Sequence, residues 1–223
     1  MRLRPAAITL AVTALLGITA APAHAAPHRA AGDTVTTTLY AAIDDLPVAD
    51  ESRDGYVRTA FRHWTDADGN GCDTRKEVLI AEAVDKPAVG PKCALSGGIW
   101  VSPYDDLVLT DSKLLDVDHV VPLAEAWDSG ASNWSAKQRE QYANDLDEPR
   151  ALIAVSAKSN RSKADKDPAD WMPPAAGYAC TYLADWTAVK TRWGLSVDAR
   201  EVDALHRIAA GCDDAELQVV LAR

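Results

Sequence analysis

The sequence lacks several features that mark large classes of protein. Its four cysteines include no Cys-x-x-Cys pair, which argues against a zinc site built from cysteines. After the N-terminal segment no apolar run is long enough to cross a bilayer, and there is no internal repeat. Basic residues are also few, with 23 Lys and Arg against 33 Asp and Glu, a formal net charge of −10. Such an acidic chain has no general attraction for nucleic acid, so any binding of phosphates must be local.

The N-terminal segment has the pattern of a secretory signal peptide. Two arginines precede an apolar stretch over residues 6–20, and a small-x-small processing site ends at Ala25. We predict a signal peptide over 1–25, a leader over 26–33 and a single domain over 34–223. The mature protein is expected to be extracellular, with no membrane association once the signal has been cleaved.

The four cysteines all lie after the predicted cleavage site, and an exported protein meets an oxidising compartment. Their even number therefore predicts two disulfides. Four cysteines can pair in three ways, and closeness along the chain favours Cys72–Cys93 and Cys180–Cys212.

Hydrophobic spacing predicts a mixed α+β domain with few short strands. Strands are expected at about 99–101, 114–121 and 151–155. Helices are expected at about 39–46, 57–64, 182–193 and 202–208, with another in the second half of 126–146. Residues 74–83 fit either a strand or a helix.

One polar pair interrupts the predicted strand over 114–121. Asp118 and His119 stand side by side near its end, and Asn160 follows the next predicted strand. An imidazole can serve as a general base, whereas carboxylate and amide oxygens are the ligands that Mg²⁺ or Mn²⁺ prefers. Adjacent strand residues point to opposite faces, so the pair can share a site only if the strand twists or frays at its end. Pro122 makes such an ending reasonable.

Basic side chains gather around Asn160 despite the acidic total. We predict that Arg161, Lys163 and Lys166 bind flanking phosphates, with Arg75 as a further candidate. A run of charges is more often a solvated face, and only the position of this run beside Asn160 favours a functional role.

Residues 115–174, taken as a unit, resemble the HNH endonucleases, the ββα-metal group. The branch they are most similar to includes the C-terminal domain of GmrSD-type restriction enzymes. An Asp-His-x-x-Pro start, followed by Asn-Arg-x-Lys and Asp-Pro, carries the resemblance. It implies an α+β fold in which a ββα-metal core is embedded in a mainly helical, disulfide-stapled domain. It also implies a secreted endonuclease of little sequence specificity that uses Mg²⁺ or Mn²⁺ and cuts nucleic acid, DNA ahead of RNA. No protein partner is indicated.

The resemblance also assigns roles to individual residues. His119 would be the general base, and Asp118 and Asn160 would be the metal ligands. The middle Asn of the family, which steadies the loop that carries the base, has no direct match before the second strand. Asn144 is the best substitute for it and Asn133 the second choice.

Residues 66–77 fit a different pattern, the calcium loop D-x-[DN]-x-[DN]-G-x5-E. The candidate ligands are Asp66, Asp68, Asn70 and Glu77. A plain Asp/Gly/Asn turn is the simpler interpretation, because Asp73 stands where calcium loops carry an apolar residue. The alternative function is a non-catalytic exported binding module, which would respond chiefly to Ca²⁺ rather than to Mg²⁺ or Mn²⁺.

Overall fold

The computed structural model describes residues 30–223, and the predicted signal peptide and residues 26–29 of the predicted leader lie outside this range. The described residues form the mixed α+β domain that the sequence predicts. The helices are α1 (Leu39–Asp44), α2 (Thr74–Glu82), α3 (Leu123–Asp128), α4 (Ala136–Ala143), α5 (Ala157–Lys163), α6 (Ala179–Trp193) and α7 (Ala199–Ala209). The strands are β1 (Thr34–Thr38), β2 (Ala88–Gly90), β3 (Ala94–Ser96), β4 (Trp100–Ser102), β5 (Leu107–Leu109), β6 (Leu115–His119), β7 (Leu152–Ser156) and β8 (Glu216–Val220).

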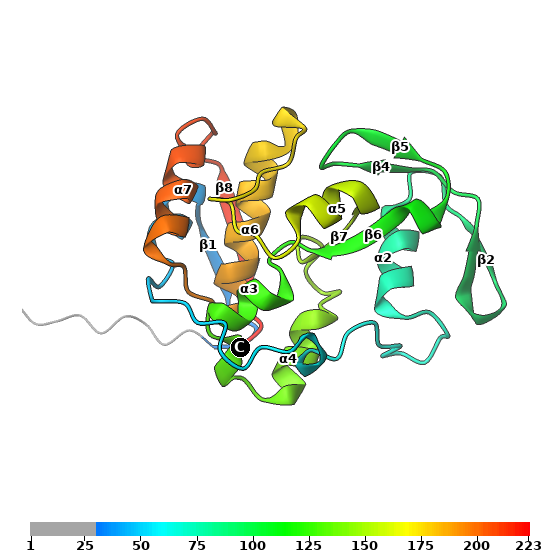
Figure 1. Ribbon diagram of the computed structural model, residues 1–223, viewed down its shortest axis with the longest axis horizontal. Coiled ribbons are helices and arrows are strands. Elements are labelled where there is room, and N and C mark those ends of the chain that lie inside the picture. The colour runs from blue at the N-terminus through cyan, green and yellow to red at the C-terminus, as the bar shows by residue number, and fades with distance from the viewer. Residues whose placement is uncertain (1–29) are drawn as a thin grey trace, which may run out of the picture.

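The strands form four separate two-stranded antiparallel ribbons, β1–β8, β2–β3, β4–β5 and β6–β7. In Figure 1 the β1–β8 ribbon lies with α6 and α7 at one side of the molecule, and β6–β7 lies near the centre between α5 and α2. Helix α2 packs on β6 and β7, and α5 contacts both strands on its own side. The central ribbon is therefore held between two helices.

The junction between β7 and α5 has no loop. Ser156 is both the last residue of β7 and the N-cap of α5, where its hydroxyl accepts a hydrogen bond from the Ser159 backbone N–H. Asp105 accepts hydrogen bonds from the hydroxyls of both serines, at 2.6 and 2.9 Å. These contacts fix the direction in which α5 leaves the strand, and so fix the side chains of α5 relative to β6.

The sequence analysis missed the β1–β8 ribbon. It pairs Thr34 with Val220 and so joins the two ends of the described domain. In β1 only Val35 is buried, because the rest of the strand is threonine. Local periodicity gives little signal for such a strand, since its stability comes from a partner that lies far away in the chain.

The helix predicted over 57–64 is wrong. The structure has only one 3-10 turn there, Arg58–Ala60, and the chain then runs extended through Phe61. The phenylalanine side chain is fully buried, and Trp64 has a left-handed backbone with φ of 60°. Contacts with distant residues decide this segment against its helical spacing.

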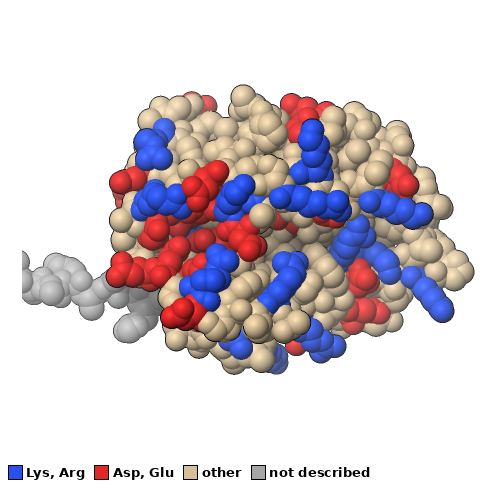
Figure 2. Space-filling view, in the orientation of Figure 1, with Lys and Arg blue, Asp and Glu red and all other residues tan. Residues whose placement is uncertain are grey.

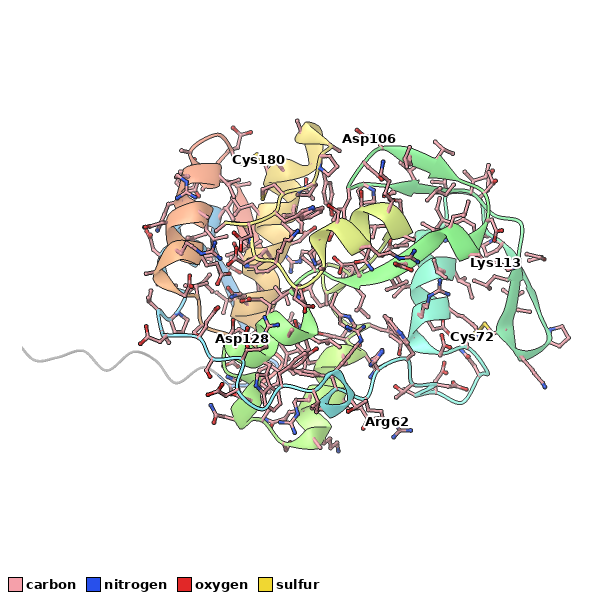
Figure 3. All side chains as sticks on the ribbon, in the orientation of Figure 1. Arg62, Cys72, Asp106, Lys113, Asp128 and Cys180 are labelled. Atoms are coloured by element: carbon pink, nitrogen blue, oxygen red, sulfur yellow. A yellow bond between two sulfur atoms is a disulfide. The ribbon has the colours of Figure 1, made fainter. Side chains whose placement is uncertain are left out.

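Both predicted disulfides are present, Cys72–Cys93 and Cys180–Cys212. The first ties the loop before α2 to the β2–β3 ribbon, as the yellow bond beside Cys72 shows in Figure 3. The second joins the start of α6 to the turn that follows α7. Each bond closes a loop and thereby lowers the conformational entropy of the unfolded chain.

The first testable prediction concerns Glu82 at the end of α2. Its Oε2 accepts a hydrogen bond of 2.7 Å from the Ala154 backbone N–H on the edge of β7, and burial raises the pKa of Glu82 to about 7 from an ordinary value of 4.5. Stability from this group is therefore complete below pH 4.5 and is lost as the pH rises through about 7. We expect the melting temperature of Glu82→Gln, relative to that of the wild type, to increase as the pH is raised from 5 to 8.

The matched control for this prediction is Glu216→Gln, which changes an exposed glutamate on β8. The difference in melting temperature between this variant and the wild type should stay the same across that pH range. A constant difference for Glu82→Gln as well would contradict the assignment.

Candidate active site

A pocket of about 320 Å³ opens beside the ends of β6 and α5. It brings together four residues that the sequence analysis had singled out, Asp118, His119, Asn160 and Arg161. The full lining consists of Arg58, Val117, Asp118, His119, Pro122, Leu123, Asn160, Arg161, Ala164 and Asp165.

His119 is held at its Nε2 edge. This nitrogen lies 3.0 Å from the Ala143 carbonyl oxygen at the end of α4, and a carbonyl can only accept. Nε2 must therefore carry the proton, which leaves a lone pair on Nδ1. The rings of Trp64 and Tyr142 both stack with the imidazole, at centroid distances of 5.4 and 6.4 Å. The residue is thus fixed as a neutral tautomer, and its Nδ1 accepts no hydrogen bond from residues 30–223.

Burial lowers the pKa of His119 to about 3. The hydrogen bond to Ala143 raises it, while the positive charges of Arg58 and Lys163 and the neighbouring His63 lower it further. At neutral pH the imidazole is uncharged, which is the state that a general base needs before it takes a proton.

Asp118 and His119 make contacts in different directions, as strand alternation requires, yet both line the pocket at the end of β6. Oδ2 of Asp118 accepts hydrogen bonds from the Tyr104 hydroxyl at 2.7 Å and from the Lys163 ammonium at 2.6 Å. Burial raises the pKa of Asp118 and lowers that of Lys163, and the ion pair opposes both shifts.

Asn160 points toward β6 from the middle of α5. Its Nδ2 donates to Oδ2 of Asp116 at 3.2 Å. Within residues 30–223, neither Oδ1 of Asn160 nor Oδ1 of Asp118 accepts a hydrogen bond. One carboxylate oxygen and one amide oxygen thus remain as acceptors in the same pocket. This donor set fits a hard divalent cation such as Mg²⁺ or Mn²⁺.

Asn144 lies directly after Ala143 and caps α4 without touching His119. Its Oδ1 accepts from the Thr65 backbone N–H at 2.9 Å and from the Thr74 hydroxyl at 2.8 Å. Its Nδ2 donates to the carbonyls of Arg62 and Glu140, at 2.8 and 2.7 Å. Through these four hydrogen bonds Asn144 fixes the backbone next to Ala143, whose carbonyl accepts the hydrogen bond from His119.

Asn133, the second choice for that role, makes none of these contacts. It is exposed at the end of a 3-10 turn, Ala131–Asn133.

The structure separates the four residues predicted to bind phosphates. Arg161 is exposed at the pocket, 3.5 Å from Asp116. Lys166 is exposed beside an adjoining depression. Lys163 is fully buried on Asp118 and does not reach a phosphate. Arg75 donates to the Leu115 carbonyl, at the opposite end of β6 from His119. The last two placements contradict the predicted role.

The sequence analysis missed Arg58, which lines the pocket from the segment before α2. No motif surrounds it, and the helical spacing of that segment suggested a different structure. In Figure 2, basic side chains border a hollow on this face, and acidic side chains gather toward one end of it.

The candidate calcium loop is closed by its own hydrogen bonds. Asn70 Nδ2 donates to Asp68 at 2.9 Å and to Glu77 at 2.8 Å, and Asp66 accepts from the Gly71 backbone N–H at 3.0 Å. The segment before the loop is not the helix that a calcium-loop arrangement requires. Calcium binding at this loop stays a prediction.

Another acidic group, Glu51, Glu125 and Glu201, has oxygens that lie within 4.8 Å of one another, close enough to hold a metal ion. The structure already supplies a cation there. The Lys190 ammonium donates to Glu125 at 2.8 Å and to Glu201 at 2.6 Å, and it is fully buried. The ammonium pairs with two of the three carboxylates, and burial raises the pKa of Glu51 to about 8 and that of Glu201 to about 7, so the geometry is explained without a metal.

Comparison with known proteins identifies the family of the chain. Residues 90–208 match the family described as "GmrSD restriction endonucleases, C-terminal domain". The chain belongs to this family. It is also 39% identical over 207 residues to an uncharacterized secreted protein of Arthroderma benhamiae, with 92% of this chain and 97% of the relative covered. No solved structure matches the chain.

The resemblance stated from the sequence is thus confirmed at the level of the family. The secreted relative and the two disulfides confirm the predicted extracellular location. Among the described residues, no helix has the length and apolar character needed to cross a membrane.

The second prediction concerns the Lys163–Asp118 pair. Lys163→Met leaves a buried carboxylate without its cation, which should lower the free energy of unfolding by about 3–5 kcal/mol, as measured by urea denaturation. Mn²⁺ should raise the melting temperature of this variant more than that of the wild type, because Asp118 then lacks its counter-charge.

Lys166→Met, three residues further on, is the control. Its ammonium is exposed on the Ser162 carbonyl, so this change should be nearly neutral. Equal stabilities for the two variants would show that the buried pair does not hold α5 on β6.

Proposed function

We propose that this protein is a secreted, metal-dependent endonuclease with a ββα-metal site built from β6, β7 and α5. The observation that carries the proposal is the pocket itself. It joins an imidazole that has a free Nδ1 to two oxygen ligands that accept no hydrogen bond from the described residues. The membership of the chain in a family of restriction-endonuclease domains supports the same reaction class.

In this proposal His119 Nδ1 takes a proton from a water molecule, and the resulting hydroxide attacks the phosphorus of a phosphodiester. The bond to the 3′ oxygen then breaks, which leaves a 5′-phosphate and, once that oxygen has taken a proton from water, a 3′-hydroxyl. The Ala143 carbonyl stabilises the imidazolium through Nε2. A divalent ion held by Asp118 and Asn160 would neutralise charge on the phosphate and on the leaving oxygen.

Arg58 and Arg161 carry the phosphate contacts in this proposal. Both line the pocket, from the segment before α2 and from α5 respectively. A guanidinium matches the geometry of a phosphate and keeps its charge at any working pH. Because the whole chain is acidic, we expect modest affinity for nucleic acid and a strong dependence of that affinity on salt. The resemblance to HNH endonucleases further suggests little sequence specificity, with DNA ahead of RNA as the substrate.

The alternative is a non-catalytic binding module that responds to Ca²⁺ through residues 66–77. Its strongest support in the sequence was the missing middle Asn. The contacts of Asn144 around the base weaken that support, because a positioning residue is present.

The third prediction tests the nuclease directly. The mature, oxidised protein should cut plasmid DNA at low salt with Mg²⁺ or Mn²⁺ and fail to cut it in EDTA. Loss of a general base typically costs at least about 100-fold in rate, so His119→Ala should be nearly inactive. His206→Ala, an exposed histidine on α7, is the control and should keep full activity.

No cleavage of plasmid, single-stranded DNA or RNA with any metal would overturn the nuclease and favour the calcium-responsive module. Full activity in His119→Ala would overturn the identity of the base.

The fourth prediction concerns phosphate contacts. For binding to a DNA duplex in the presence of Ca²⁺, Arg58→Ala and Arg161→Ala should each reduce the slope of log affinity against log salt by about 0.9. Arg62→Ala is the matched control, since Arg62 is 76% exposed, pairs with Glu140 and does not line the pocket. A slope that stays the same in the first two variants would remove these arginines from the interface.

A further inference from the structure

Trp64 has an unusual backbone for its residue type. Its φ of 60° lies in the left-handed region, which bulky L-residues rarely adopt. The usual reasons for a positive φ do not apply, because the residue is not a glycine and does not lie in a tight hairpin. Its side chain is only half-buried. Strained conformations of this kind persist where surrounding contacts enforce them, and they cluster at functional sites.

The contacts that enforce it come from Asn144, which bonds the chain on both sides of the tryptophan. Its Nδ2 donates to the Arg62 carbonyl, two residues before Trp64, and its Oδ1 accepts from the Thr65 backbone N–H, one residue after it. The Thr65 carbonyl in turn accepts from the backbone N–H and the hydroxyl of Thr74, both at 2.9 Å. One side chain thus brackets the strained residue.

The result of this backbone is the position of the indole ring. It stacks with the His119 imidazole at a centroid distance of 5.4 Å and an interplanar angle of 29°. The residue before Asn144 is Ala143, whose carbonyl accepts the hydrogen bond from His119 Nε2. The same asparagine therefore governs two restraints on the imidazole, the ring that stacks with it and the oxygen at its Nε2 edge.

We propose that Trp64 is a positioning residue for the general base, held in its left-handed conformation by Asn144. The indole prevents the imidazole from tilting away from Ala143, and so keeps Nδ1 directed into the pocket. The proposal rests on the proposed function, since it takes His119 to be the base.

The test uses Trp64→Phe, which keeps an aromatic ring, and Trp64→Asn, which tolerates the left-handed backbone but has no ring. We expect Trp64→Asn to lower kcat for plasmid cleavage at least about tenfold with KM nearly unchanged, and Trp64→Phe to stay within about threefold of the wild type. Trp127→Phe is the matched control, because its half-buried indole contacts Tyr56 and Phe61 instead of His119.

A second measurement does not depend on activity. In the folded wild type, the buried Nε2–H of His119 should give a slowly exchanging proton signal by ¹⁵N-resolved NMR. This signal should persist in Trp64→Phe and in the Trp127 control, and it should be lost in Trp64→Asn. Asn144→Asp should lose it too, because a carboxylate cannot donate to the Arg62 carbonyl.

An Nε2–H signal and a kcat that both survive in Trp64→Asn, or in Asn144→Asp if Trp64→Asn fails to fold, would overturn the proposal. If the wild type cuts no nucleic acid, the nuclease is wrong, yet the NMR comparison still decides whether Trp64 and Asn144 hold the imidazole.

Discussion

One buried ammonium holds the C-terminal end of α5 against β6. Lys163 is the last residue of α5, and its Nζ donates to Oδ2 of Asp118 at 2.6 Å and to the backbone carbonyl of His119 at 3.0 Å. Both members of the Asp-His pair are thus joined to the helix that carries Asn160. A buried pair of this kind contributes little net stability when compared with an apolar pair, but breaking it is costly, so it specifies one arrangement. Here that arrangement places Asp118 and Asn160 beside His119 in one pocket.

Some basic side chains are buried and others lie at the surface, and this difference decides which of them a phosphate can contact. Lys163 and Lys190 are buried among carboxylates, so these two basic residues do not contribute to the surface that a phosphate meets. Arg58 and Arg161 stand at the pocket instead. The neighbouring depression is lined by more acidic than basic side chains, although Arg53, Lys166 and Arg200 are among them, so it is less favourable to a phosphate backbone. If the proposed function holds, a nucleic-acid strand is favoured at the two arginines and disfavoured toward the acidic depression.

Much of this structure could be predicted from local sequence. The strands that carry Asp118 and precede Asn160 lie where apolar runs predicted them, and α6 ends at Gly194, which takes a left-handed C-cap. The disulfides followed from closeness in the chain. The burial of Lys163 could not be predicted from local sequence, because its charge suggested a surface position and a contact with phosphate. Only the fold shows that it faces Asp118, one strand away.

The residues that the sequence did not reveal share one property, which is that their partners are distant. Trp64 and Arg58 were assigned to a helix because their spacing is helical, whereas the hydrogen bonds of Asn144 and the burial of Phe61 set the actual path. Both residues lie before residue 90, where the family match begins. In the proposed nuclease, β6, β7 and α5 supply the base and the oxygen ligands, but the ring on the imidazole and one guanidinium at the pocket come from the segment before α2. The motif is therefore an incomplete site by itself, and the surrounding domain completes it.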